Sequence, residues 1–220
     1  MAPLRKRLAA EGLGSAFLLA AVVGSGIMAD RLSGGNVGLA LLANAVATGA
    51  TLTALILMLG AISGAHFNPV VTLGAAHDGS LAWGDGALYV LAQVSGAVAG
   101  VLLAHVMFGQ PAWQTSAHVR AGTGQIVSEF VATFGLVAVI TRTARDRPEW
   151  VAVAVGAYIT GAYWFTASTS FANPAVTVAR SFTDTFAGIR PADAPGFIAA
   201  QLAGAVAGRA LARWLEESRS

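Results

Sequence analysis

The sequence has 220 residues, of which 55% are hydrophobic and 11% are charged, and its formal net charge is +2. Because soluble domains carry about 25% charged residues, this composition and the mean hydropathy of +0.66 predict a membrane protein, and the six apolar stretches described next predict that it is an all-α membrane protein. The low charge, without a basic run, argues against nucleic acid as a partner, and the absence of cysteine excludes disulfides and thiolate metal sites. With no nucleophile, metal-ligand spacing or cofactor motif, we expect no catalytic, metal-binding or cofactor-binding residue and no enzyme activity.

Six apolar stretches are long enough to cross a bilayer, which requires about 20 mostly apolar residues. They lie at residues 8–29, 38–61, 86–108, 125–143, 150–168 and 195–215. The first follows a basic cluster, as the apolar part of a signal peptide would. It is nevertheless long enough to span and has no clear cleavage site, so we expect a retained first helix.

Lysine and arginine placement predicts the orientation of these helices. If the amino terminus is cytoplasmic, nine basic residues fall on the inner side and four on the outer side. The inner set is Arg5, Lys6, Arg7, Arg142, Arg145, Arg147, Arg209, Arg213 and Arg219, and the outer set is Arg31, Arg120, Arg180 and Arg190. This asymmetry predicts that both termini are cytoplasmic, as an even number of helices requires.

The chain repeats itself. The segment AQVSGAVAG at 92–100 matches AQLAGAVAG at 200–208, and its glycines four apart favour close packing of membrane helices. The repeats cover about 8–108 and 125–215, with three spans each. Because three is odd, the second repeat must be inverted relative to the first, which places a functional site near the midplane. We expect residues 1–220 to form a single transmembrane channel domain.

Two further segments, 62–76 and 169–181, are too short and interrupted to span. They contain Asn68-Pro69-Val70 and Asn173-Pro174-Ala175, and asparagine at the N-cap followed by proline indicates a helix start. Inverted symmetry brings the two starts together inside the membrane. Their helix dipoles oppose the passage of cations, and the carboxamides of Asn68 and Asn173 can donate hydrogen bonds to a solute. A single Asn-Pro is an ordinary turn signal, whereas this symmetric pair predicts a pore.

The chain resembles the aquaporin and aquaglyceroporin family (major intrinsic proteins) over its whole length. The resemblance rests on the segment 63–72 (SGAHFNPVVT), Asn173-Pro174-Ala175, the two repeated segments around Gln93 and Gln201, and Glu11 and Glu129. It implies six transmembrane helices and two re-entrant half-helices in a right-handed bundle. It also implies a homotetramer in the lipid bilayer with one pore per subunit, and no cofactor.

The chain departs from the family pattern at two places. Val70 stands where the first motif usually has alanine, which we interpret as a packing variation. Val176 stands where most members have an arginine in the outer constriction. Counting from the asparagines, the other constriction positions of the family fall on Thr48, Gly161 and Ser170.

These four residues predict a wide, uncharged selectivity ring that admits solutes larger than water. Arg180 lies one helical turn beyond Val176, and two interpretations stay open: it reaches the outer vestibule, or it extends to the outer membrane interface. Tyr163 and Trp164 likewise either belong to an interfacial aromatic belt or narrow the vestibule.

Two carboxylates lie inside apolar spans, where a charge is costly and therefore usually functional. Glu11 and Glu129 are either a proton relay or, as the resemblance implies, acceptors for backbone N–H groups that hold the half-helix leads. Their symmetric placement favours the second role. His66 is expected to line the inner pore, as a packed, hydrogen-bonded side chain in preference to a pH gate. His77, His105 and His118 are expected in loops or at interfaces.

We therefore expect a passive channel for water and small uncharged solutes of the glycerol class, with neutral metalloid acids such as arsenite as further candidates. Bacterial family members in which valine replaces this arginine resemble a metalloid-handling branch. Because this chain has the same valine, the resemblance implies that the protein lies in a bacterial inner (plasma) membrane. The alternatives are a water-selective channel, a proton-coupled secondary transporter, and an enzyme or receptor built on a membrane bundle.

Overall fold

The computed structural model describes residues 2–217, and every regular element in this range is helical. The predicted set of six long and two short helices is confirmed. The long helices are α1 (Leu4–Leu32), α2 (Val37–Ser63), α4 (Trp83–Met107), α5 (Thr123–Asp146), α6 (Val151–Phe165) and α8 (Ala194–Glu217); the short ones are α3 (Pro69–His77) and α7 (Pro174–Arg180). Two 3-10 turns, Pro148–Trp150 and Pro191–Asp193, precede α6 and α8.

Four helices, α1, α2, α4 and α5, are long and apolar enough to cross a membrane by length and composition. Helix α6 has 15 residues and ends at Phe165, three residues before the predicted end of that span at 168, because Thr166 turns into an extended conformation. Helix α2 runs to Ser63, two residues past its predicted end. It stops at Gly64, whose φ of 90° is the left-handed C-cap that glycine adopts without steric cost.

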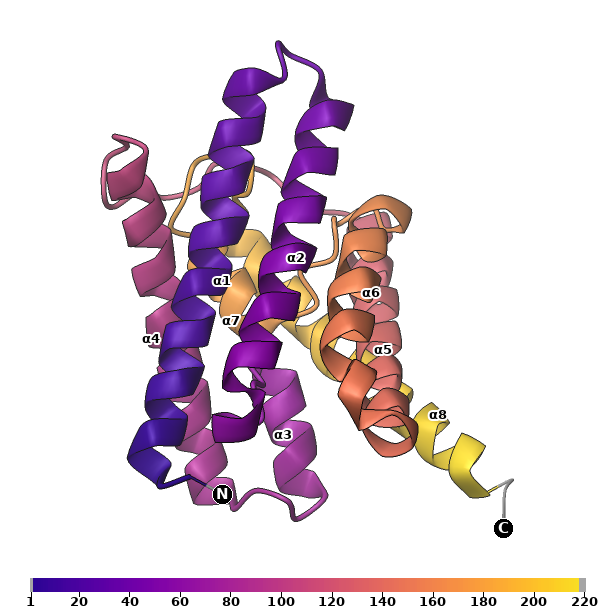
Figure 1. Ribbon diagram of the computed structural model, residues 1–220. Coiled ribbons are helices and arrows are strands. Elements are labelled where there is room, and N and C mark those ends of the chain that lie inside the picture. Colours follow the sequence, from indigo (N-terminus) through magenta and orange to yellow (C-terminus); the bar gives the residue numbers. More distant parts are fainter. Residues whose placement is uncertain (1, 218–220) are drawn as a thin grey trace.

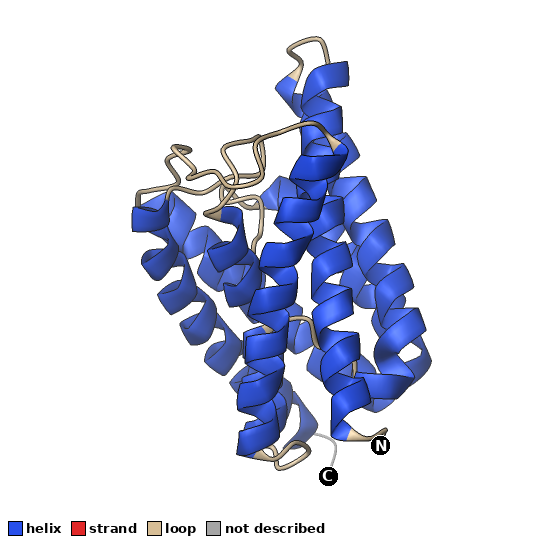
Figure 2. Ribbon diagram, turned by 90° about the vertical axis from the view of Figure 1, so that its left-hand side faces the viewer, coloured by secondary structure: helices blue, strands red, loops and turns tan. Residues whose placement is uncertain are grey.

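The long helices stand side by side as a bundle, and α3 and α7 enter it from opposite ends (Figure 1). The start of α1 and the end of α8 lie at the same end of the bundle. The longest loops gather at the other end (Figure 2). The basic residues predicted to be outside lie in or contact the loop segments 108–122 and 181–193; they are Arg31, Arg120, Arg180 and Arg190. Of the predicted inner set, Arg219 lies outside the described residues.

Glycines allow the helix backbones to touch within each repeat. Helix α1 packs on α4, and α5 packs on α8. A β-carbon at Gly96 would overlap the carbonyl oxygen of Gly12, and one at Gly204 would overlap that of Phe130. The repeated glycines therefore provide the close approach that their spacing predicts. Between the repeats, α2 meets α6 in the same way: a β-carbon at Gly49 would lie 2.7 Å from the carbonyl oxygen of Gly156.

Candidate pore

The two half-helices begin where they were predicted, each with asparagine as N-cap and proline in the first turn. The side-chain oxygen of Asn68 accepts from the Val70 N–H at 3.1 Å. That of Asn173 accepts from the Ala175 N–H at 3.0 Å and the Val176 N–H at 3.3 Å. The side-chain oxygens thus satisfy helix-start donors that would otherwise be orphaned at membrane depth.

The same asparagines join the two repeats crosswise. Asn68 Nδ2 donates to the carbonyl oxygen of Ala172 at 2.8 Å, and Asn173 Nδ2 donates to that of Phe67 at 2.7 Å. Both asparagines also line a cavity. Since a carboxamide carries two donor hydrogens, one remains on each side chain for a solute. Pro69, Val70, Pro174 and Ala175 are buried but do not line this cavity, which fits a packing role for Val70.

Glu11 lies fully buried in α1 and accepts four hydrogen bonds. Its Oε1 accepts from Ser63 Oγ at 2.6 Å and from the His66 N–H at 3.0 Å. Its Oε2 accepts from the Phe67 N–H at 2.7 Å and from Gln93 Nε2 at 2.8 Å. Four donors thus converge on one carboxylate. They position the lead of α3 and leave no free site for a proton relay.

Glu129 repeats this arrangement in α5. Its Oε1 accepts from Ser168 Oγ at 2.6 Å and from the Phe171 N–H at 2.9 Å. Its Oε2 accepts from the Ala172 N–H at 2.9 Å and from Gln201 Nε2 at 2.6 Å. The two glutamines that the sequence repeat singled out therefore tie the carboxylates to α4 and α8.

The leads that these carboxylates hold have an unusual backbone. Ala65 and Phe67 before α3, and Ser170 and Ala172 before α7, have φ between 47° and 51°. This left-handed region costs L-residues about 1–2 kcal/mol each. Residues 64–67 and Ser170 line the cavity. The strained leads keep backbone carbonyls beside the solute path.

One cavity of about 530 Å³ passes both half-helix starts. Its wall is mostly apolar where α1, α2, α5 and α6 form it, with Leu18, Val22, Leu52, Ile56, Leu136, Ile140, Val151, Val155 and Ile159. Polar groups are concentrated in the two leads and at the two ends. At the end near the termini, the wall includes Asp78, Ser80 and Arg209.

The predicted selectivity ring is only partly brought together. Thr48, Ser170 and Val176 line the cavity, and all three are buried. Gly161 does not, so its predicted placement in the ring is wrong: it is exposed, and a β-carbon there would meet nothing within 4 Å. The residues of α6 that line the cavity follow one another four positions apart and end at Tyr163. Gly161 lies two positions before Tyr163, and this spacing places it on the opposite face of the helix.

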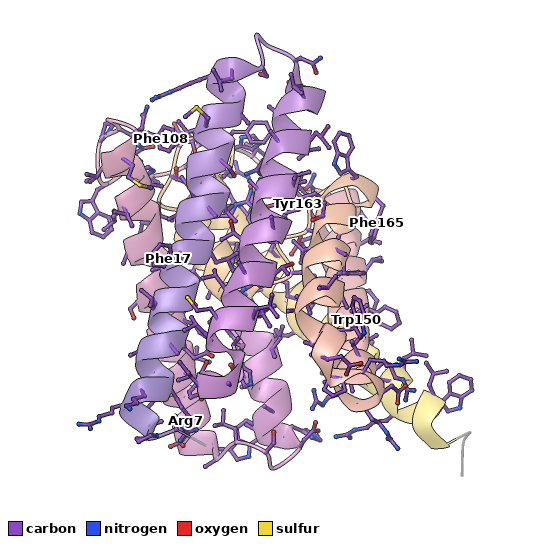
Figure 3. All side chains as sticks on the ribbon, in the orientation of Figure 1. Arg7, Phe17, Phe108, Trp150, Tyr163 and Phe165 are labelled. Carbon is purple, nitrogen blue, oxygen red and sulfur yellow. The ribbon has the colours of Figure 1, made fainter. Side chains whose placement is uncertain are left out.

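Tyr163 takes the place in the wall that Gly161 was expected to fill. It is 3% exposed, and its hydroxyl lies 3.3 Å from Thr48 Oγ1. Figure 3 shows Tyr163 on α6 beside α2, whereas Phe165 lies on the outside of the bundle. Trp164 is also exposed. Of the two interpretations for this aromatic pair, narrowing of the vestibule therefore applies to Tyr163, and membrane contact fits Trp164.

The histidines take different positions. His66 lines the cavity, and its Nδ1 lies 3.0 Å from Thr72 Oγ1. His77 and His118 are exposed, near the end of α3 and in the loop before α5. His105 differs from its expected loop or interface position, because it is fully buried in the last turn of α4. Its ring nitrogens contact the carbonyl oxygen of Ala112 and Thr183 Oγ1, each at 2.8 Å.

These features, two capped half-helices meeting inside a bundle of membrane helices and a cavity passing both, define a membrane channel. Residues 2–150 match the family model of the major intrinsic proteins. The chain is 58% identical over 212 residues to aquaglyceroporin AqpS of Rhizobium meliloti (strain 1021), covering 96% of this chain and 91% of that protein. It is 33% identical to probable aquaporin TIP2-2 of Oryza sativa subsp. japonica, covering 80% and 73%.

The fold is similar to that of the aquaglyceroporin from Plasmodium falciparum, with a TM-score of 0.73 at 21% identity, covering 96% of this chain and 95% of that one. The chain therefore belongs to the major intrinsic protein family and is an integral membrane channel.

Proposed function

We propose that this chain is a passive channel for small uncharged solutes of the glycerol class, and for water. The observation that supports this most directly is the cavity of about 530 Å³ that passes Asn68 and Asn173. Glu11 and Glu129 are occupied by backbone and glutamine donors, which argues against a coupled transporter. Transport then needs exchange of hydrogen bonds only, with no covalent step.

The cavity wall suits a polyol. One side presents the lead backbone and the carboxamides, and the other presents aliphatic side chains such as Leu52, Ile140 and Val155. The hydroxyl groups of a polyol can exchange their hydrogen bonds with water for hydrogen bonds with the polar side of the wall. Its C–H groups can pack on the aliphatic side. Neutral arsenite, a small trihydroxy molecule, has the same polarity and is included in the proposal. The similarity to a protein named aquaglyceroporin supports this solute class.

A water-selective channel is the competing proposal. It is favoured by Tyr163 and Arg180, which both line the cavity beside Thr48 and leave less room at the outer end than the predicted ring. Pore size and polar lining together decide which solute enters. The two proposals therefore differ in whether glycerol accompanies water.

Stopped-flow light scattering on proteoliposomes separates these proposals. We expect the protein to speed water exit under a sucrose gradient and to speed entry of glycerol and arsenite, with no saturation at low concentration and no dependence on a proton gradient. Empty liposomes and Asn173→Leu, which removes one pore carboxamide, serve as controls. Water flux without glycerol flux would instead establish the water-selective channel.

We further propose a homotetramer in a bacterial inner membrane with both termini cytoplasmic. Large apolar side chains, including Leu42, Val46 and Leu57 on α2, are exposed on the outside of the bundle. Such a surface is suited to lipid and to neighbouring subunits. The predicted charge asymmetry supports the orientation.

A further inference from the structure

Arg180 is the last residue of α7 and lies one turn beyond Val176. It is 2% exposed, so it does not extend to the membrane interface. Its Nε donates to the carbonyl oxygen of Ala187, and its guanidinium carbon lies 3.4 Å from the centroid of the Phe171 ring. The side chain is therefore fixed inside the protein by a carbonyl and by a cation–π contact.

No salt bridge joins Arg180 to a carboxylate within residues 2–217. A second buried guanidinium is nearby: that of Arg120 lies 5.1 Å from the centroid of the same Phe171 ring. Arg120 donates to the carbonyl oxygens of Gly188 at 2.8 Å and Ser168 at 3.2 Å. Burial lowers the pKa of Arg120 to about 10, which still leaves it protonated at neutral pH. Two positive charges are thus held at the outer end of the bundle by carbonyls and one aromatic ring.

Only Arg180 of this pair lines the cavity. The Nε of Arg180 donates to Ala187, whereas neither terminal nitrogen has a hydrogen-bond partner in the described part of the chain. These terminal nitrogens are not fully enclosed by protein atoms, so they border open space. A buried arginine with free donors beside the cavity is suited to contact a passing solute.

We propose that Arg180 supplies the outer positive barrier of this channel, in place of the ring position occupied by Val176, and presents its terminal N–H groups to solute oxygens. The inference rests on the proposed channel function and deepens it. A fixed positive charge in a poorly hydrated passage repels a cation more strongly than it would in water. Displacing the charge by one helical turn leaves the ring of Thr48, Ser170 and Val176 uncharged. It still requires every solute to pass a guanidinium.

The test compares Arg180→Met, an unbranched side chain of similar reach, with Arg190→Met as control. Arg190 belongs to the same end of the molecule, but its guanidinium pairs with Asp193 at 2.7 Å and does not line the cavity. Proton and sodium permeability are measured in proteoliposomes with entrapped indicator dyes, and water and glycerol flux by light scattering on the same preparations. We expect Arg180→Met to raise cation permeability at least about tenfold, which corresponds to about 1.4 kcal/mol, while Arg190→Met leaves it unchanged.

A double variant moves the charge back to the ring. Val176→Arg combined with Arg180→Met is expected to return cation permeability to the wild-type level and to reduce glycerol flux more than water flux. If Arg180→Met does not assemble, Arg180→Gln is used for the same comparison. Unchanged cation permeability in an Arg180 variant that still conducts water normally would overturn the proposal. So would a wild-type protein that conducts cations freely.

Failure of the proposed function is distinguishable from failure of this inference. Wild-type liposomes that conduct water but not glycerol contradict the proposed solute class. The cation comparison between wild type, Arg180→Met and Arg190→Met remains readable from the dyes in either case.

Discussion

Replacing Glu129 by alanine is expected to abolish solute flux and to destabilise the folded protein by at least about 3 kcal/mol, because hydrogen bonds to a charged acceptor contribute about 1.5–3 kcal/mol each. The change leaves four buried donors, on Ser168, Phe171, Ala172 and Gln201, without their acceptor. It also releases the strained lead in which Ala172 has a φ of 47°. The start of α7 then loses its fixed position opposite α3.

Two controls interpret this result. Glu129→Gln retains the shape and one acceptor oxygen, so we expect a smaller loss than for alanine. Glu149→Ala removes an exposed carboxylate in the 3-10 turn before α6 and is expected to have no effect. Thermal unfolding in detergent and light-scattering flux provide the two measurements. If Glu129→Ala keeps wild-type stability and flux, the carboxylate does not position the lead.

Replacing Gly96 by alanine is expected to cost about 1–3 kcal/mol of stability, the usual penalty for overpacking, and to reduce the yield of folded channel. A β-carbon at Gly96 overlaps the backbone carbonyl of Gly12, which cannot rotate away as a side chain would. Helices α1 and α4 must therefore separate, and Gln93 then moves away from Glu11.

The matched control is Gly60→Ala in α2, where a β-carbon meets nothing within 4 Å. Because alanine is the better helix former, this change is expected to stabilise the protein by roughly 0.5–1 kcal/mol. The two variants add the same methyl group to a helix, so opposite shifts of the thermal midpoint identify the packing effect. A stabilised Gly96→Ala would show that α1 and α4 are not in close contact.

The sequence alone predicted the features of the fold and site whose signals are local or repeated. Asn68-Pro69 and Asn173-Pro174 carry their own cap and first turn, so the starts of α3 and α7 followed from adjacent residues. Glu11 and Glu129 were found because each is a lone carboxylate at the same place in a repeated span. Beside the backbone donors that the resemblance implies, the structure adds serine and glutamine side chains, which lie 39 to 82 residues away in the chain.

The failures concern side chains whose surroundings depend on distant segments. Gly161 was placed by counting back from Asn173, but the intervening residues from Thr166 are not helical, so the count does not fix a helix face. The burial of Arg180 depends on Ala187 in a returning loop and on Phe171. His105 is buried because Ala112 and Thr183 fold over it. None of these contacts has a signal in the local sequence.

The central claim is that solutes pass through the cavity between the half-helices. The chain has no cysteine, so single cysteines at Ile159 and Gly161 test it on one helix. Ile159 lines the cavity, whereas Gly161 lies on the opposite, exposed face of α6. A bulky thiol reagent, with labelling verified by mass spectrometry, is expected to block water and glycerol flux through Ile159→Cys and to leave Gly161→Cys unaffected. Full labelling of Ile159→Cys with undiminished flux would contradict the account.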